Sequence, residues 1–133
     1  MKRKAINPAG LYDSLMFGFS HAVEQNGGRT LHLAGQVGWN SKGELVGPGD
    51  LRAQARQALA NLKTVLAEAG ATPADVVRLR TYVVNHSPDK LQPVAEEIMA
   101  FYDGAVPAAN TWIGVQSLAM PEFLIEIEAI AAL

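Results

Sequence analysis

The pattern of apolar and polar residues predicts two amphipathic helices. Between Asp50 and Gly70, apolar side chains recur every three or four residues, which is the spacing of one helical face. Asp50 suits the N-cap of this helix, and Gly70 suits the position just after its end. A second stripe with the same spacing follows Ser87-Pro88, a capping residue before a proline at the first helical position. We expect each apolar stripe to lie on a sheet, with charged residues such as Arg56 on a solvated face.

Runs rich in β-branched and aromatic residues predict strands around these helices. Residues 17–23 and 30–38 are joined by a segment that contains Asn-Gly-Gly, which favours a hairpin. Residues 77–84 alternate in polarity, and residues 111–133 hold two apolar runs around a proline, predicted to form a second hairpin. The order β-β-α-β-α-β-β indicates an α+β fold, with a mixed sheet and both helices packed on one of its faces.

The predicted strands carry apolar residues on both faces of the sheet. In the last strand, Leu124 and Ile130 alternate with Ile125 and Ile127. Two helices on one side can cover only one of these faces. An uncovered apolar face predicts that the protein associates with copies of itself.

Length and charge narrow the class of protein. A chain of 133 residues is expected to form one domain, residues 1–133, with residues 1–16 as an extended N-terminal segment. The net charge is −2 and the only basic cluster is Lys2-Arg3-Lys4, so no nucleic-acid groove is predicted. Polar residues interrupt residues 5–18, so we expect neither a signal peptide nor a membrane span, and a cytoplasmic location.

The residue types needed for several common kinds of site are missing or badly spaced. The chain has no cysteine, which excludes disulfides and thiolate nucleophiles. His21, His32 and His86 show no spacing typical of metal ligands, so no metal site is expected. Gly35 lies inside a predicted strand, where glycine marks either a bulge or the close approach of another group.

Four segments resemble, in order and spacing, the RidA (YjgF) family: AGQVG, DLRAQARQALANLKTVLAEAGA, VVRLRTYVVN and IEIEAIA, at residues 34–38, 50–71, 76–85 and 125–131. The resemblance implies a fold similar to that of chorismate mutase. It also implies a homotrimer whose sheets form a central barrel, with a small-molecule ligand in the cleft between neighbouring subunits. These implications agree with the two-sided strands.

The activity that the resemblance implies is hydrolysis of reactive enamine or imine intermediates to keto compounds and ammonia. It implies no metal or organic cofactor. Gly35 and Gln36 match the family pattern, and Glu126 matches the glutamate to which the family assigns positioning of the attacking water. Glu128 shares a strand face with Glu126, where two like charges can raise a carboxyl pKa; the resemblance gives Glu128 no role.

Several positions depart from the family pattern. Asn110, just before Thr111, occupies the position of the arginine that binds the substrate carboxylate in deaminating members. Ala34 replaces the usual serine, and Phe19 replaces an aromatic hydroxyl. A neutral amide lacks the charge that makes an arginine clamp strong. Arg78 or Arg80 is a possible substitute.

The predicted site therefore has Glu126 as the catalytic residue. The predicted substrate-binding residues are Phe19, Ala34, Gly35, Gln36, Asn110, Thr111 and Trp112. Two functions stay open: a hydrolase of enamines or imines with an altered substrate, and a trimer that binds a small metabolite in a divergent cleft without turning it over. An endoribonuclease, a label that members of the family sometimes carry, has less support because the sequence shows no basic surface.

Overall fold

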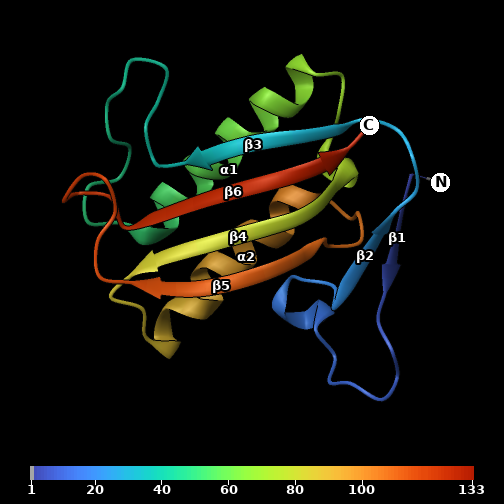
Figure 1. The fold of residues 1–133 in the computed structure, drawn as a ribbon. Coiled ribbons are helices and arrows are strands. Elements are labelled where there is room, and N and C mark those ends of the chain that lie inside the picture. The colour runs from blue at the N-terminus through green and yellow to red at the C-terminus, as the bar shows by residue number, and fades with distance from the viewer. Residues whose placement is uncertain (1) are drawn as a thin grey trace.

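A four-stranded mixed sheet forms the centre of the computed structural model, which describes residues 2–133. Figure 1 shows the strand order β3-β6-β4-β5. The strands are β3 (Thr30–Gln36), β6 (Ile125–Ala132), β4 (Val76–Val84) and β5 (Ala109–Val115). β5 runs parallel to β4, whereas β6 is antiparallel to both β3 and β4. The predicted mixed sheet is confirmed.

The predicted N-terminal hairpin is wrong. β2 (Ala22–Gln25) pairs with a strand that the sequence analysis missed, β1 (Arg3–Ile6), and not with β3. β3 pairs with β6 from its start, where Arg29 and Leu133 exchange both backbone hydrogen bonds, at 3.2 and 2.8 Å. Gly27 and Gly28 still form a turn with positive φ, but the turn leads the chain from one sheet into the other.

The predicted C-terminal hairpin is also wrong. β5 lies at one edge of the sheet, and β6 is inserted between β3 and β4, so the two closing strands do not pair with each other. A loop between them carries the chain past β4. Local turn residues indicate a change of direction there, but the partner of β6 is decided by long-range pairing.

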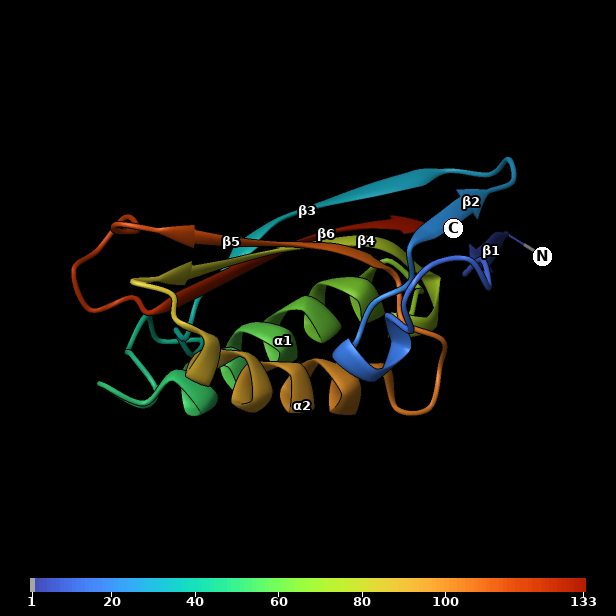
Figure 2. The same ribbon diagram turned by 90° about the horizontal axis from the view of Figure 1, so that it is seen from below.

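Both helices lie on one face of the sheet, as predicted (Figure 2). α1 (Leu51–Glu68) begins after Asp50, whose carboxylate accepts a hydrogen bond of 3.0 Å from the Ala53 N–H. Gly70, with φ of +77°, follows the end of α1. α2 (Leu91–Tyr102) continues from the short 3-10 helix η3 (Pro88–Lys90). No helix within the described part of the chain combines the length and the apolarity needed to cross a membrane.

The core lies between the helices and the sheet. Its fully buried side chains include Leu62, Leu66, Leu79, Ile98, Ile125 and Ile127. Each contributes roughly 1.5–3 kcal/mol through removal of its apolar surface from water. Because side chains alternate along a strand, burial of Ile125 and Ile127 directs Glu126 and Glu128 to the opposite face of β6.

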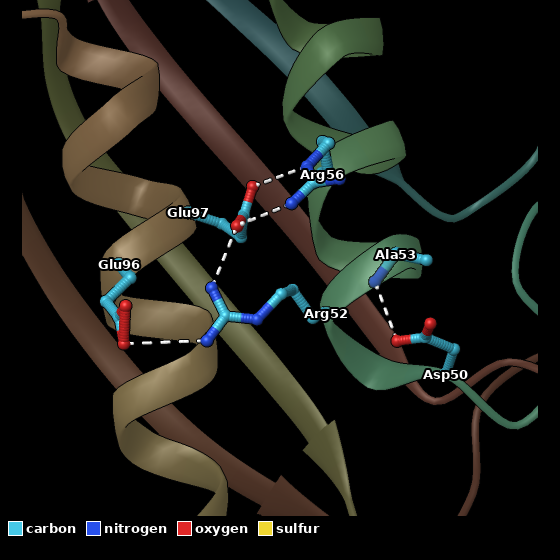
Figure 3. Close-up of polar contacts among 6 residues, drawn as sticks. All are labelled: Asp50, Arg52, Ala53, Arg56, Glu96 and Glu97. Carbon is cyan, nitrogen blue, oxygen red and sulfur yellow. Dashed lines mark hydrogen bonds and ion pairs between the residues drawn. The ribbon is translucent and has the colours of Figure 1, made fainter.

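An ion-pair cluster joins the two helices (Figure 3). Arg56 makes two hydrogen bonds to the Glu97 carboxylate, at 2.9 and 3.1 Å, and Arg52 binds Glu97 at 3.1 Å and Glu96 at 3.5 Å. These bonds hold the pKa of the Glu97 carboxyl below its usual value, and the bonds from Arg56 have the largest effect. Arg56 was expected only to be solvated, and it is paired because its helix lies beside α2.

No helix covers the other face of the sheet in a single chain (Figure 2). This face carries more polar side chains than predicted. On this face the Tyr82 hydroxyl donates to the Glu128 carboxylate, and an Arg80 nitrogen lies 3.9 Å from the same carboxylate. Ile130 is apolar and half-buried, as expected, but Leu124 precedes β6 and is not part of the strand.

Candidate functional site

Glu126 lies in a groove that we call the β3-edge groove, with a volume of about 780 Å³. It is formed where β3 and β6 meet the loop after β3 and the exposed side of α1. Its lining residues are Gly35, Gln36, Val37, Trp39, Asn40, Ser41, Gln57, Asn61, Thr64, Val65, Phe123 and Glu126. Two of the predicted site residues, Gly35 and Gln36, therefore lie with Glu126.

Gly35 allows the Glu126 side chain to lie directly over the backbone of β3. A Cβ atom at position 35 would come within 2.6 Å of the Glu126 Oε2 atom, a distance that real Cβ atoms essentially never show. The pairing of β3 with β6 also shifts register between Leu33 and Gln36. Both features predicted for a glycine in this strand, a bulge and a close approach, are confirmed.

The electrostatic environment of Glu126 favours its protonated form. Partial burial raises the pKa of the Glu126 carboxyl above its usual value, and the nearby charge of Glu128 raises it further. Glu128 has other partners, because the Tyr82 hydroxyl and Arg80 both contact it. Of the two carboxylates, Glu126 therefore has the environment of a group that transfers protons.

One wall of the groove is held by polar contacts between α1 and the loop after β3. The Asn61 Nδ2 atom donates to the backbone carbonyls of Val37 and Trp39, at 3.1 and 2.9 Å. The Gln57 amide donates to the Asn61 Oδ1 atom at 2.8 Å. Trp39 also contacts Phe123 edge to face, with ring centroids 5.0 Å apart. No pattern in the sequence predicts this wall, because these α1 residues lie on a polar helix face that resembles any solvated one.

Gln54 connects α1 to two loops, one of which contains the groove residue Phe123. Its side chain is fully buried. The Nε2 atom donates to the carbonyls of Gly47 and Glu122, at 3.1 and 3.3 Å, and the Oε1 atom accepts from the Leu124 N–H at 2.9 Å. Gln54 thereby holds the segment that contains Phe123 and leads into β6.

A second group of predicted residues lies at the other edge of the sheet. There, a cavity of about 320 Å³, which we call the β5-edge pocket, is lined by Tyr12, Phe17, Phe19, Leu91, Ala95, Asn110 and Trp112. Tyr12 contacts Phe17 and Phe19 edge to face, each at 6.4 Å between ring centroids. Three predicted residues, Phe19, Asn110 and Trp112, thus share one pocket.

Some polar atoms of this pocket already form hydrogen bonds within the chain. The hydroxyl of Thr81, a fully buried residue on β4, donates to the Asn110 Oδ1 atom at 3.2 Å. The Trp112 Nε1–H donates to the His86 Nδ1 atom at 3.3 Å. The side-chain amide of Asn110 is therefore oriented with its oxygen toward the sheet, which leaves its NH2 group as the donor for a ligand.

The remaining predicted residues lie outside both cavities. Ala34 lies beside the groove, where its carbonyl accepts from the Gln36 amide at 3.4 Å. The side chain of Thr111 is on the uncovered face of the sheet and accepts a hydrogen bond of 3.0 Å from Arg78. Arg78 and Arg80 line a small recess on that face together with Glu128, so neither arginine lies beside Asn110 in the same chain.

The structure of one chain does not bring the two halves of the predicted site together. The groove belongs to the β3 edge and the pocket to the β5 edge, and β6 and β4 lie between these two edges (Figure 1). Glu126 also projects from the uncovered face of β6, whereas Asn110 lies on the helix side of β5 with Thr81.

The sequence analysis missed Tyr12 in the β5-edge pocket. Tyr12 belongs to an irregular segment before the 3-10 helix η1 (Leu15–Phe17), where no periodicity marks a side chain as part of a site. Its presence beside Phe19 gives the pocket a hydroxyl. Within residues 2–133, no group of three or more His, Asp or Glu side chains is arranged to hold a metal ion.

Comparisons with known proteins agree with the resemblance found in the sequence. Residues 13–133 match the family model described as endoribonuclease L-PSP. A protein of Dermatophagoides farinae named 2-iminobutanoate/2-iminopropanoate deaminase is 32% identical over 116 residues, 86% of this chain and 85% of that protein. Its Mus musculus namesake is 36% identical over 115 residues, 85% of this chain and 79% of that protein. The crystal structure of YyfB from Yersinia pestis, a Rid family protein described as of unknown function, is 68% identical over the whole of both chains, with a TM-score of 0.98.

Proposed function

The chain belongs to the endoribonuclease L-PSP family, also called RidA (YjgF), and from that premise we propose that it hydrolyses a reactive imine, or the enamine that tautomerises to it, to a keto compound and ammonia. The observation that carries the proposal is the Glu126 carboxyl, which lies over Gly35 in an open groove and has a raised pKa. The names of the relatives from Dermatophagoides farinae and Mus musculus support the same reaction class.

The reaction needs one water and one group that moves protons. Water oxygen bonds to the imine carbon while Glu126 accepts a proton from the water and passes it to the imine nitrogen, which gives an amino alcohol. Glu126 then accepts the hydroxyl proton and returns it to the nitrogen as the C–N bond breaks, so that a carbonyl and ammonia leave. A carboxyl whose pKa is raised by its surroundings is suited to both transfers.

The proposal includes assembly of the site from two copies of the chain. The β3-edge groove of one copy would face the β5-edge pocket of its neighbour, as in the subunit cleft that the family resemblance implies. Support comes from the location of the two halves at opposite sheet edges and from the sheet face that the helices leave uncovered. A single RidA-like domain over residues 1–133, a homotrimer with a barrel core, and a cytoplasmic location are part of the same proposal.

Ribonuclease activity is not part of the proposal. The family description contains the word endoribonuclease, but a net charge of −2 gives RNA phosphates little electrostatic attraction.

The test is clearance of imines that are generated in situ and detected by trapping with semicarbazide. The panel includes substrates with a carboxylate, a carboxamide and an ester next to the imine carbon. We expect the protein to accelerate loss of at least one of them, and Glu126→Gln to abolish the acceleration. Glu68→Gln, at an exposed position of α1, is the matched control and should keep full activity. No acceleration over buffer for any member of the panel would refute the proposal.

A further inference from the structure

We propose that the β5-edge pocket binds an uncharged group that carries a hydrogen-bond acceptor, such as the carboxamide or ester of an aromatic or aliphatic imine, and discriminates against a free carboxylate. The inference rests on the proposed function for the reaction at Glu126. It adds the chemical class of the substrate, which neither the family description nor the names of the relatives supply for this chain.

The lining of the pocket offers no charge to pair with a carboxylate. Six of its seven residues are aromatic or aliphatic, the seventh is Asn110, and none is a lysine or an arginine. A carboxylate placed there would lose its hydration without gaining a counter-charge, which is unfavourable. An amide or an ester loses far less hydration and suits the same surface.

The hydrogen-bonding pattern of Asn110 asks for an acceptor on the ligand. Thr81 is fully buried and donates to the Asn110 Oδ1 atom, so one of the two acceptor sites of this oxygen is used within the chain. The NH2 group of Asn110 remains to donate to the ligand, and a carbonyl oxygen fits it. The Trp112 N–H is used by His86 and does not compete for the ligand.

Apolar surface around the pocket is exposed in the isolated chain. Tyr12 is 62% exposed, Phe17 is 51% exposed and Leu91 is 41% exposed. A ligand with an aromatic or aliphatic side chain, held between this surface and the neighbouring copy of the proposed assembly, would cover part of it. The volume of about 320 Å³ lies within the range of small-molecule sites.

The two histidines beside the pocket are already engaged within the chain: the His21 Nε2 atom contacts the Tyr12 carbonyl oxygen at 2.8 Å, and the His86 Nδ1 atom accepts from Trp112. Arg78 and Arg80 lie on the uncovered sheet face, where they contact Thr111 and Glu128. In the proposed assembly the groove of a neighbouring copy adds Glu126, whose ionised form repels a carboxylate. The preference for a neutral ligand is therefore set by the β5-edge pocket.

The test compares two stable analogues of the keto product that differ only in charge, 2-oxo-2-phenylacetamide and 2-oxo-2-phenylacetate. Binding to the full-length protein is measured by calorimetry at neutral pH. We expect the amide to bind at least about tenfold more tightly than the carboxylate. Asn110→Arg should reverse this order, because a guanidinium pairs with the carboxylate. The unfolding temperature of this variant verifies that it folds.

The wild-type comparison needs no variant and decides the inference by itself. Equal binding, tighter binding of the carboxylate, or no binding of either compound would overturn it. The readout is independent of turnover, so its failure is distinguishable from failure of the proposed function. If the protein clears imines but binds the carboxylate more tightly, the proposed hydrolase stands and the neutral pocket is overturned. If it binds the amide more tightly but clears no imine, the neutral pocket stands and the proposed hydrolase is overturned.

Discussion

The two edges of the sheet carry cavities of different character. The β3-edge groove is open, its lining mixes polar and apolar side chains, and it contains a carboxyl with a raised pKa. The β5-edge pocket is smaller and aromatic, and its lining holds no charged side chain. The difference suggests a division of tasks, with proton transfer at one edge and selection of the substrate at the other. The two tasks can then be perturbed separately.

The largest effect is expected at the groove. Glu126→Gln keeps the size of the side chain but cannot accept a proton, so we expect turnover to fall by about 10²–10⁴-fold. Binding of neutral ligands at the pocket should change little. Steady-state kinetics measures the turnover, and calorimetry measures the binding of neutral ligands. A Glu126→Gln variant that retained turnover would show that this carboxyl is not part of the mechanism.

The pH dependence of the wild-type protein tests the same carboxyl. The ionised form of Glu126 accepts the first proton, so the rate should fall as the pH falls through the pKa of this group. Because burial and the Glu128 charge raise that pKa, the fall should begin at a higher pH than for an ordinary glutamate. The raised pKa also means that ionisation of Glu126 slightly destabilises the fold as the pH rises through it, so Glu126→Gln should be as stable as wild type or more so at neutral pH.

The next largest effect is expected from Gln54, which supports the groove and does not touch the pocket. Gln54→Leu removes three hydrogen bonds and leaves two carbonyls and an N–H without this partner. We expect a loss of about 2–4 kcal/mol in the free energy of unfolding, measured by chemical denaturation. Gln57→Leu, at a partly exposed position of the same helix, should cost much less. Equal costs for the two variants would show that burial of Gln54 is not the cause.

Gly35→Ala tests whether the position of the Glu126 carboxyl matters, because the variant keeps this carboxyl but displaces it. The new Cβ would displace the Glu126 side chain, whose closest atoms belong to its flexible end. We expect turnover to fall about tenfold or more while the unfolding temperature changes little. Gly10→Ala is the control, because a Cβ there meets no atom within 4 Å. Full activity of Gly35→Ala would mean that the close approach has no catalytic value.

The smallest effect concerns the connection between the two halves. Glu97 on α2 binds Arg52 and Arg56 on α1, and these helices line the pocket and the groove respectively. We expect Glu97→Gln to cost about 1 kcal/mol of stability at neutral pH. Since the pKa of Glu97 is lowered in the folded state, this contribution is present above the unfolded pKa and disappears as the pH falls through the folded one.

A pair of thermal unfolding series checks the Glu97 prediction. The difference between Glu97→Gln and wild type should shrink as the pH is lowered into the acidic range. Glu96→Gln is a matched control because its contact with Arg52 is longer, at 3.5 Å, and exposed on both sides. A difference that does not depend on pH would contradict the ion-pair explanation.

The sequence predicted the parts of the fold that depend on local pattern. Both helices, the Asp50 cap and the face of β6 that carries Glu126 follow from periodicity and alternation. The C-terminal hairpin was wrong because β6 pairs with β3 and β4, which are distant in the chain, and no turn residue encodes that pairing. The N-terminal hairpin was wrong because β2 pairs with β1, a short strand that no local pattern marks.

The sequence likewise predicted only those parts of the candidate site that a local pattern or a family motif marks. Gly35 and Glu126 stand out as a glycine and a carboxylate inside apolar strands, but the expected role of Glu126 came from the family resemblance. The contact between Thr81 and Asn110 joins neighbouring parallel strands, and no local pattern reveals it. Tyr12 lies in an irregular segment, and the separation of the site into two edges depends on strand order. Spatial neighbours of this kind need the structure.

The most direct test of the account is a mixing experiment, because its central claim is that one site takes its halves from two copies of the chain. Glu126→Gln disables the groove, and Ala95→Trp fills the β5-edge pocket, so each variant alone should be inactive. When equal amounts of the two variants assemble at random into closed rings, about a quarter of the sites should take an intact groove from one variant and an intact pocket from the other. About a quarter of the wild-type activity should therefore return. Mixed assemblies that form but stay inactive would contradict the claim and place the whole site within one chain.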